Sequence, residues 1–280
     1  MKTLYITDLD GTLLHDDAQV SEFTARTLSE LSERGALISV ATARTPATVS
    51  RIMADVHTSV PMVVMTGAAM WSPLTHTFSD LRLIERDRVD ALQRVFAASP
   101  ITPFCYTLAA DSTHLEVYHA AESLSPAEQY FVDLRKKLSL KHFDLHSTAP
   151  YEALNRVALF FAIGSETDIV AAVEAAKAAT DCYVSYYKDI YFPDTWLLEI
   201  FAHGVSKAHG VTRLRQITGA ERVVVFGDNL NDIAMMQQAD EAVAVENALP
   251  QTKAVAHRII GTNNSDAVAR YIQEDFTKNK

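Results

Sequence analysis

Two carboxylates stand one residue apart directly after a short apolar run near the start of the chain. The stretch is YITDLDGTLL, residues 5–14, in which Asp8 and Asp10 are followed by Gly11. At the carboxyl end of a strand in a parallel sheet, side chains enter the crevice where such folds bind ligands, and the strand period of two predicts both acids on the same side. Because two neighbouring carboxylates repel each other, this pair predicts a bound cation.

A second acidic strand end follows much later in the chain. In VVVFGDNLND, Asp228 comes directly after an apolar run, and Asn231 and Asp232 follow it closely. A single acid at a strand end is more often only a turn former or a helix cap. Two such ends that meet in one crevice form a site of hard oxygen ligands, which favours Mg2+.

Two further stretches predict a phosphate site. ATAR at 41–44 puts Thr42 and Arg44 at the end of the second predicted strand, where a hydroxyl and free backbone N–H groups at a helix start can bind an anion. GVSKAHG at 204–210 puts Lys207 in the first turn of a predicted helix, where a cation is unfavourable unless an anion lies nearby. Each has an ordinary alternative: a helix N-cap for the threonine, and an exposed, tolerated lysine.

Strand and helix patterns alternate along the first part of the chain, which predicts a βαβ arrangement that would hold these residues. Strand-like runs lie at 3–7, 36–44 and 61–67, with helical patterns at 21–35 and 46–55. The same alternation resumes after residue 201. It predicts an α/β, Rossmann-like, doubly wound core with a mostly parallel sheet and helices on both faces.

The middle of the chain has a different pattern. Strand-like runs follow one another there without a helix between them, at 102–108 and 113–119 and again at 182–187 and 196–201. This spacing predicts antiparallel pairing, and therefore an inserted α+β domain at 83–200. The core, 1–82 plus 201–280, is then discontinuous in sequence.

Composition excludes several classes of protein. The chain has 280 residues, of which 48% are hydrophobic, and a formal net charge of -10, which predicts a folded protein without a nucleic-acid partner. It has no secretory signal and no apolar run that spans a bilayer, so we expect a cytoplasmic protein without a membrane partner. The two cysteines lack the spacing of a zinc or redox motif.

In their order along the chain, DLDGTLL, ATAR, GVSKAHG and GDNLND resemble the four motifs of the haloacid dehalogenase superfamily. The spacing, and the insertion between the second and third motifs, resemble its Cof-type branch (subclass IIB), the sugar-phosphate phosphatases with a C2-type cap. EAVAVENA and GTNNSDAVARYI extend the resemblance over the core, whereas the cap matches only in position, size and pattern. The chain departs from the family at Thr66, usually Asn, and at Val245 and Glu246, often Met-Gly.

The resemblance implies a catalytic role for both acids of the opening stretch. Asp8 would be the nucleophile that forms an aspartyl-phosphate, and Asp10 would be the general acid for the leaving alkoxide and then the base that activates water. Mg2+ would be held by the Asp8 carboxylate, the Asp10 backbone carbonyl and the Asp228 carboxylate.

It also implies roles around the phosphoryl group. Thr42 and Lys207 would bind the transferring phosphoryl oxygens, and Asn231 and Asp232 would organise the metal site. Of these groups, we expect Asn231, together with Arg44, to contact the substrate. Substrate choice is expected to rest with the cap, where the candidates are Cys105, Tyr106, His114, Glu116, Tyr118, Lys188 and Trp196.

The function expected from these residues is Mg2+-dependent hydrolysis of small phosphomonoesters, such as sugar phosphates or phosphorylated cofactors. A small phosphorylated metabolite is then the partner, and the protein is expected to be a monomer or a homodimer. Two alternatives remain open at this point: a phosphomutase of the same superfamily, and a regulator that binds a phosphorylated ligand without turnover.

Overall fold

The computed structural model describes residues 1–189 and 192–279, and the chain divides into two compact units. One unit combines Met1–Leu81 with Ser206–Lys280, and the other is Arg82–Val205. The second unit overlaps the range 83–200 expected for the inserted domain and extends beyond it to Val205.

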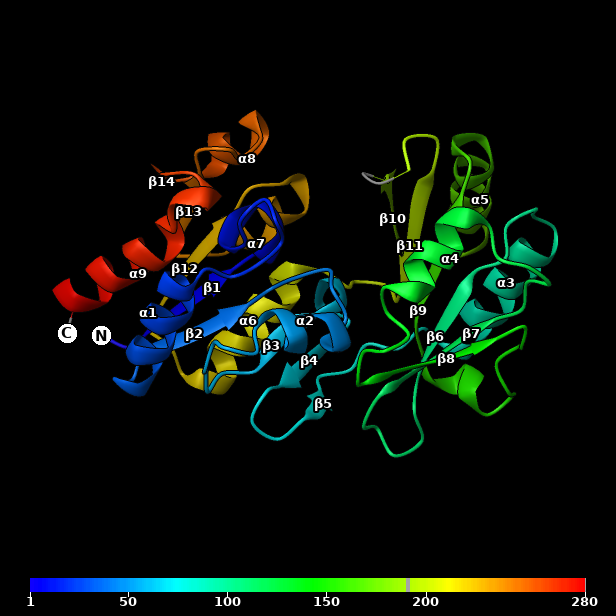
Figure 1. Ribbon diagram of the computed structural model, residues 1–280, viewed down its shortest axis with the longest axis horizontal. Coiled ribbons are helices and arrows are strands. Elements are labelled where there is room, and N and C mark those ends of the chain that lie inside the picture. Colours follow the sequence, from blue (N-terminus) through cyan, green and yellow to red (C-terminus); the bar gives the residue numbers. More distant parts are fainter. Residues whose placement is uncertain (190–191, 280) are drawn as a thin grey trace. The chain divides into compact units, whose positions relative to one another are not determined.

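The first unit is built on a five-stranded parallel sheet in the order β14-β13-β12-β1-β2 (Figure 1). Its central strand β1 is buried along its whole length, as expected for an apolar run in a sheet covered on both faces. The five strands are β1 (Thr3–Thr7), β2 (Leu37–Val40), β12 (Arg222–Gly227), β13 (Glu241–Val245) and β14 (Arg258–Ile260).

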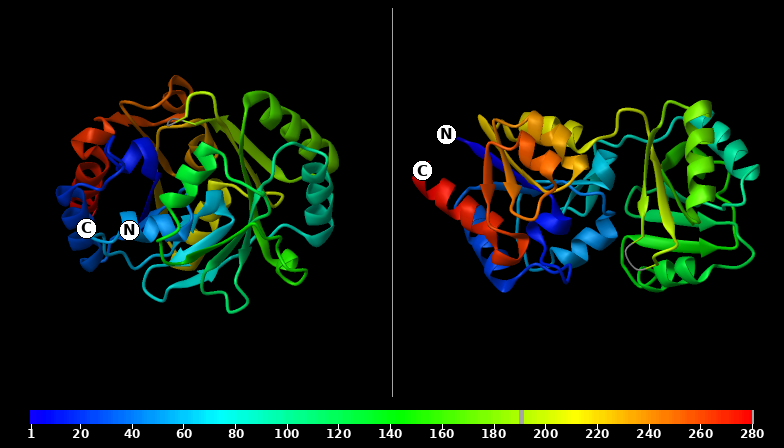
Figure 2. Two further views of the ribbon diagram at one scale, coloured as in Figure 1. Left: turned by 45° about the vertical axis from the view of Figure 1, so that its right-hand side comes forward. Right: turned by 90° about the horizontal axis from the view of Figure 1, so that it is seen from above.

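Helices cover both faces of this sheet, as Figure 2 shows from above. On one face α1 packs against α9, and on the other face α6 packs against α7. The helices lie on both faces because the chain adds strands in both directions from the centre of the sheet, and crossovers between parallel strands are right-handed. The helices of this unit are α1 (Glu22–Glu33), α2 (Pro46–Ile52), α6 (Lys207–Thr218), α7 (Ile233–Gln237), α8 (Pro250–Val255) and α9 (Ala267–Lys278).

The expected strand at 61–67 differs from the prediction. Strand β3 ends at Val64, because the backbone then takes positive φ angles at Met65 (51°), Thr66 (58°) and Gly67 (96°) and reverses. The chain returns as β4 (Ala69–Ser72), which pairs antiparallel with β3 (Met62–Val64) and with β5 (Thr77–Ser79) in a separate three-stranded sheet. A parallel bridge between Ala41 and Val63 joins this sheet to the chain just beyond β2.

The second unit is built on a six-stranded mixed sheet in the order β10-β11-β9-β6-β7-β8. All neighbours are antiparallel except β7 and β8, so the consecutive strands β6–β7 and β10–β11 pair as the spacing predicted. Strand β8 was not predicted. The strands are β6 (Phe104–Leu108), β7 (Leu115–His119), β8 (Lys141–Leu145), β9 (Val157–Gly164), β10 (Tyr183–Lys188) and β11 (Trp196–Phe201).

Two helices cover one face of this mixed sheet and a third lies on the other. Phe160 of β9 contacts Phe96 of α3 (Arg86–Ala97), with ring centroids 5.8 Å apart, and α3 packs against α5 (Glu166–Ala179). The next residue, Phe161, points to the opposite face and stacks on Phe131 of α4 (Pro126–Asp133), with centroids 4.7 Å apart.

Helix α4 is shorter than the pattern at 126–138 predicted. The helix ends at Asp133, and the amide of Arg135 donates to the carbonyl of Val132, three residues earlier, at 2.9 Å, as in the tightened last turn of a helix.

Candidate active site

Asp8 and Asp228 directly follow β1 and β12, which are neighbouring parallel strands. Their carboxylates therefore meet at the carboxyl edge of the core sheet. Together with Asp232 they form a cluster in which one oxygen of each residue lies within 4.8 Å of the others. Asp8 and Asp232 are buried, so this cluster concentrates negative charge away from water.

Lys207 is the cation at the centre of this site. It is the first residue of α6, and its Nζ donates to Oδ1 of Asp8 at 2.6 Å and to Oδ1 of Asp232 at 2.7 Å. Only 2% of the residue is exposed. Burial disfavours its charge, but the two carboxylates outweigh burial and raise the pKa of Lys207. These carboxylates are the anions that a lysine at a helix N-terminus requires.

The carboxylates remain poorly balanced by this one lysine. Burial raises the pKa of Asp8 above its ordinary value, although Lys207 acts in the opposite direction. Burial also raises the pKa of Asp228 to about 6, against the effect of a hydrogen bond from Thr12. Asp8 and Asp228, whose pKa values are both raised, are oxygen ligands that a hard divalent cation stabilises in their ionised form, so the residues present fit Mg2+.

Asp232 anchors the loop that carries Asp228. While its Oδ1 accepts from Lys207, its Oδ2 accepts the backbone N–H groups of Asp228 and Asn229, both at 3.0 Å. Because both oxygens already accept hydrogen bonds, Asp232 holds the site together rather than offering a ready ligand atom. Asn231, expected near the substrate, is exposed in the short turn Leu230–Asp232 and makes no side-chain hydrogen bond with a described residue.

Asp10 does not join the cluster of Asp8, Asp228 and Asp232, although the strand period predicted Asp8 and Asp10 on the same side. Strand β1 ends at Thr7, and the chain enters a short helical turn at Leu9–Leu13, so the strand period no longer applies. The carboxylate of Asp10 lies outside the cluster of buried acids and forms a two-point ion pair with Arg44. Arg44, expected to contact the substrate, is therefore a partner of Asp10 in this structure.

Gly11 and Thr12 fix the position of Asp228. Gly11 has φ +76°, and a Cβ there would lie 2.6 Å from Oδ2 of Asp228. The hydroxyl of Thr12 donates to Oδ1 of the same carboxylate at 2.8 Å. The contact of Thr12 was missed by the sequence reasoning, and the only available signal was its place in the DLDGTLL motif.

Thr42 is buried beside this site, but it offers fewer donors than expected. Helix α2 begins at Pro46, and the amide of Thr42 already donates to the carbonyl of Val63 at 3.0 Å. The amide of Arg44 donates to the hydroxyl oxygen of Thr42 at 3.1 Å. The hydroxyl proton of Thr42 donates to none of the described residues, so this proton is the group left for an anion.

The substrate-selecting candidates of the inserted segment do not gather on one face. Cys105 and Tyr118 pair on one face of the mixed sheet, where the hydroxyl of Tyr118 donates to Glu116 at 2.9 Å. Tyr106 points to the opposite face because it follows Cys105 in the strand. His114 precedes β7, and Lys188 and Trp196 pair at the ends of β10 and β11.

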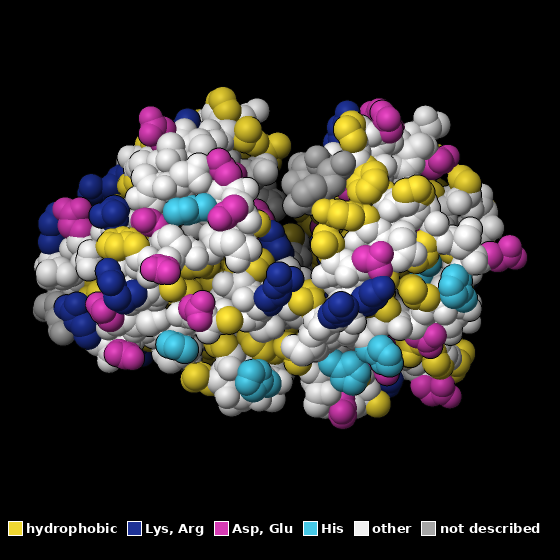
Figure 3. Space-filling model, viewed as in Figure 1, with side chains coloured by type: hydrophobic (Ala, Val, Ile, Leu, Met, Phe, Trp, Pro, Cys, Tyr) yellow, Lys and Arg dark blue, Asp and Glu magenta, His cyan; other side chains and the backbone are white. Residues whose placement is uncertain are grey.

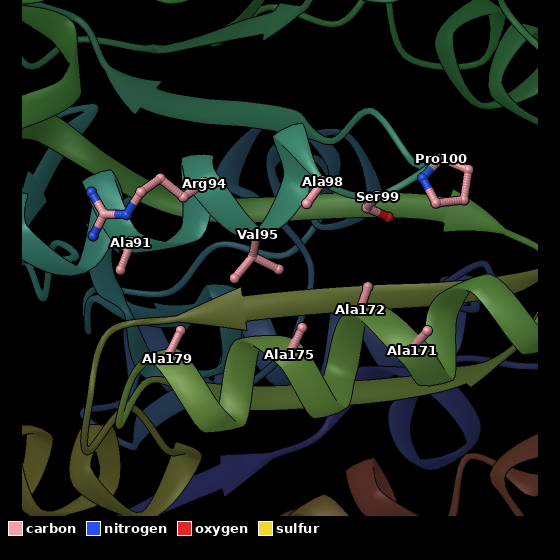
Figure 4. Close-up of a pocket in the computed structure, with 10 residues that line it drawn as sticks. All are labelled: Ala91, Arg94, Val95, Ala98, Ser99, Pro100, Ala171, Ala172, Ala175 and Ala179. Atoms are coloured by element: carbon pink, nitrogen blue, oxygen red, sulfur yellow. The ribbon is translucent and has the colours of Figure 1, made fainter.

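A cavity of about 600 Å³ lies between α3 and α5 in the second unit (Figure 4). Its wall is mostly alanine and offers no cluster of groups that could perform chemistry. It is lined by Ala91, Arg94, Val95, Ala98, Ser99, Pro100, Ala171, Ala172, Ala175 and Ala179. On the face drawn in Figure 3, basic and acidic side chains are interspersed. No helix within residues 1–189 and 192–279 combines the length and the apolar character needed to cross a membrane.

Comparison with known proteins agrees with this geometry. A family model for haloacid dehalogenase-like hydrolases matches residues 5–272. A 5-amino-6-(5-phospho-D-ribitylamino)uracil phosphatase of Bacillus subtilis is 25% identical, over 96% of each chain.

Two solved structures share the fold. A haloacid dehalogenase-like hydrolase from Bacteroides thetaiotaomicron has a TM-score of 0.81 at 21% identity, covering 99% of this chain and all of that one. A subclass IIB sugar phosphatase of the same superfamily has a TM-score of 0.71 at 18% identity and covers 99% of both chains. The α/β fold with a parallel core sheet is thereby confirmed.

Proposed function

The chain belongs to the haloacid dehalogenase-like hydrolases, and on that premise we propose that it is a Mg2+-dependent phosphatase of small phosphomonoesters that works through an aspartyl-phosphate on Asp8. The observation that carries this proposal is the buried contact of Lys207 with Asp8 and Asp232, next to Asp228. Such a site presents a carboxylate nucleophile and a fixed cation to an incoming phosphoryl group.

The metal would be held by the carboxylates of Asp8 and Asp228 and by the backbone carbonyl of Asp10. When bound, Mg2+ would neutralise charge at the phosphoryl group and favour the ionised form of the two carboxylates. Thr12 and Asp232 support this set, since Thr12 donates to Asp228 and Asp232 holds the loop of Asp228 through its backbone.

Asp8 is the proposed nucleophile because Lys207 orients one of its oxygens and leaves the other for attack. The oxygen of Asp8 forms a bond to phosphorus as the bond from phosphorus to the leaving oxygen breaks. Lys207 and the hydroxyl proton of Thr42 would stabilise the negative charge on the phosphoryl oxygens.

Asp10 is the proposed general acid and base. It would give its proton to the leaving alkoxide and then take a proton from the water that cleaves the aspartyl-phosphate. In the structure Arg44 holds the carboxylate of Asp10, and this contact supports Arg44 as the group that would position Asp10 before the reaction. Release of inorganic phosphate restores the free carboxylate of Asp8.

The inserted segment Arg82–Val205 is proposed as the cap that selects the leaving group, which is expected to belong to a small phosphorylated metabolite in the cytoplasm. The phosphatase name of the 25% identical Bacillus protein supports a small phosphorylated substrate. It leaves the identity of that substrate to experiment.

Phosphate release from a panel of sugar phosphates, nucleotides, pyridoxal phosphate and flavin mononucleotide tests the proposal, with Mg2+ or with EDTA. We expect Mg2+-dependent release by the wild type, its loss in Asp8→Asn, and full activity in Asp55→Asn, which changes an exposed acid. No release from any compound by the folded wild type would overturn the proposal. Transfer to a sugar acceptor without phosphate release would instead identify a phosphomutase.

A further inference from the structure

Lys141 is a buried lysine in the second unit, far in sequence from every residue of the active site. It opens β8, and only 6% of the residue is exposed. Its Nζ lies 5.0 Å from the ring centroid of Tyr106 and 5.9 Å from that of Phe143. Lys141 forms no hydrogen bond or ion pair with any residue of the described chain, so the aromatic faces are its only attractive neighbours there.

The charged group that acts on Lys141 is a second cation. Burial and, as the smaller cause, the guanidinium of Arg135 lower the pKa of Lys141 to about 7. Arg135 stacks on Phe131, with its Cζ 4.1 Å from the ring centroid, and donates to the Phe131 carbonyl at 3.1 Å. A buried ammonium next to a second cation attracts an anion.

The buried acid on the same face is too distant to be that anion. Residues paired across neighbouring strands lie on the same face of a sheet. Glu199 on β11 pairs with Phe161 of β9, and Phe161 pairs with Phe104 of β6. Tyr106 lies two residues after Phe104 in the same strand and therefore shares this face with Glu199. The strands of Lys141 and Glu199 are four steps apart in the sheet, roughly 19 Å between backbones at about 4.8 Å a step, and Glu199 is not among the charges that shift the pKa of Lys141. The positive charge near Lys141 is therefore not balanced by Glu199.

The hydroxyl of Tyr106 adds an unused polar group beside Lys141. Only 2% of Tyr106 is exposed, and its hydroxyl makes no hydrogen bond with a residue that the structure describes. The hydroxyl oxygen is not among the sealed polar atoms of the described residues, so a ligand can reach it. An ammonium, a guanidinium and a hydroxyl donor thus converge on one face of the mixed sheet.

We propose that Lys141, Arg135 and the hydroxyl of Tyr106 form an oxyanion site that takes a carboxylate or a phosphate group of a small metabolite. That group belongs either to the leaving group of the substrate, which rests on the proposed function, or to a separate anionic effector. A bound oxyanion pairs with both cations and accepts a hydrogen bond from Tyr106.

Malonate titration of the whole chain in metal-free buffer without a carboxylate chelator tests the site directly, with calorimetry as the readout. We expect Lys141→Met to weaken binding at least 10-fold and Tyr106→Phe, which removes only the hydroxyl, to weaken it about 3-fold or more. Lys137→Met, which removes an exposed lysine of the same unit, should bind malonate as the wild type does. Circular dichroism establishes that each variant is folded.

Kinetics then separate the two sources of the anion. If the group belongs to the substrate, Lys141→Met raises the KM at least 10-fold for 3-phosphoglycerate or fructose 1,6-bisphosphate, and leaves kcat and the hydrolysis of p-nitrophenyl phosphate unchanged. If it belongs to an effector, malonate changes the hydrolysis of p-nitrophenyl phosphate by the wild type but not by Lys141→Met.

The proposal is overturned if Lys141→Met equals Lys137→Met both in malonate binding and in KM for the acidic phosphomonoesters. Loss of malonate binding in Lys141→Met, together with no phosphate release by the wild type, would support the oxyanion site and overturn the phosphatase function instead.

Discussion

Arg44 holds the carboxylate of Asp10 through two hydrogen bonds, one to each oxygen. Its Nε donates to Oδ2 at 2.7 Å and its Nη2 donates to Oδ1 at 2.5 Å, while the Asp10 side chain remains 53% exposed. A two-point contact of this kind fixes the plane of the carboxylate as well as its place. The two acids of the DLDGTLL motif therefore have separate cations: Lys207 for Asp8 and Arg44 for Asp10.

Substitution of Arg44 by Met is expected to lower kcat by about 10- to 100-fold, because Asp10 loses the group that positions it for proton transfer. Steady-state kinetics with a sugar phosphate measures the change. Arg51→Met, which removes an exposed arginine of α2, should leave kcat unchanged. A higher kcat in Arg44→Met would show that the ion pair restrains Asp10 in an unproductive position.

Substitution of Lys207 by Met leaves two buried carboxylates without their cation. The free energy of unfolding is expected to fall by about 3–5 kcal/mol, measured by urea denaturation in EDTA. Lys278→Met, which breaks an exposed pair with Glu274, should change it by less than about 1 kcal/mol. Adding Asp8→Asn to Lys207→Met should recover part of the loss, and a double variant that loses the sum of both single effects would contradict the coupling.

We expect the hydroxyl of Thr12 to affect the Mg2+ dependence of activity through its hydrogen bond with Asp228. Thr12→Val keeps the shape of the side chain but removes the hydrogen bond to Oδ1, so the half-activating Mg2+ concentration is expected to rise roughly 10-fold. Phosphate release against Mg2+ concentration measures it. Thr252→Val is the matched control, since Thr252 is equally buried and its hydroxyl has no partner among the described residues. Equal Mg2+ dependence in both variants would argue against a role of Thr12 at the metal.

Gly11→Ala separates crowding from backbone strain. A methyl group at Gly11 would approach Oδ2 of Asp228, whereas one at Gly35 meets nothing within 4 Å. Both positions have positive φ, so each variant should lose about 1 kcal/mol of stability from strain. Only Gly11→Ala should also lose activity, by roughly 100-fold or more, because Asp228 is displaced. Retained activity in Gly11→Ala would mean that Asp228 moves freely.

Glu199 gives the second unit a pH-dependent stability. Burial raises the pKa of Glu199 from 4.5 to about 7, although a hydrogen bond with Tyr187 acts in the opposite direction. Tyr106 is the other titratable group that faces Glu199. Below pH 4.5 both folded and unfolded states hold the proton, so Glu199 has no effect on stability there. Between pH 4.5 and 7 only the unfolded state releases it, so stability falls as the pH rises.

Glu199→Gln should therefore match the wild type near pH 4.5 and exceed it by about 3 kcal/mol at pH 8. Urea denaturation over this pH range gives the difference. Glu174→Gln, at an exposed position of α5, should show no such trend. A constant difference between Glu199→Gln and the wild type would contradict the raised pKa.

Local patterns were sufficient for the central strands of the core sheet and for most helices, whereas the edge strand β14 was not predicted. Apolar runs such as TLYIT and RVVVFG are buried on both faces, so their period and length identify them without tertiary information. Strand β8 was missed because KHFDL, with its alternating exposed residues, is stabilised by pairing with β7 rather than by its own composition. The early end of β3 depends on positive φ at Met65 and Thr66, which residue types alone do not indicate.

The sequence by itself determined that Asp8 and Asp228 meet in the candidate site, because parallel neighbouring strands bring them to the same edge of the sheet. Only the tertiary structure decided which charges pair. The period of a strand placed Asp10 beside Asp8, but the turn at Leu9–Leu13 directs it to Arg44. Such charge partners come from segments distant in sequence, so packing and burial decide which groups pair, and the local pattern does not. For the same reason the sequence did not indicate that Lys141 is buried among aromatic side chains.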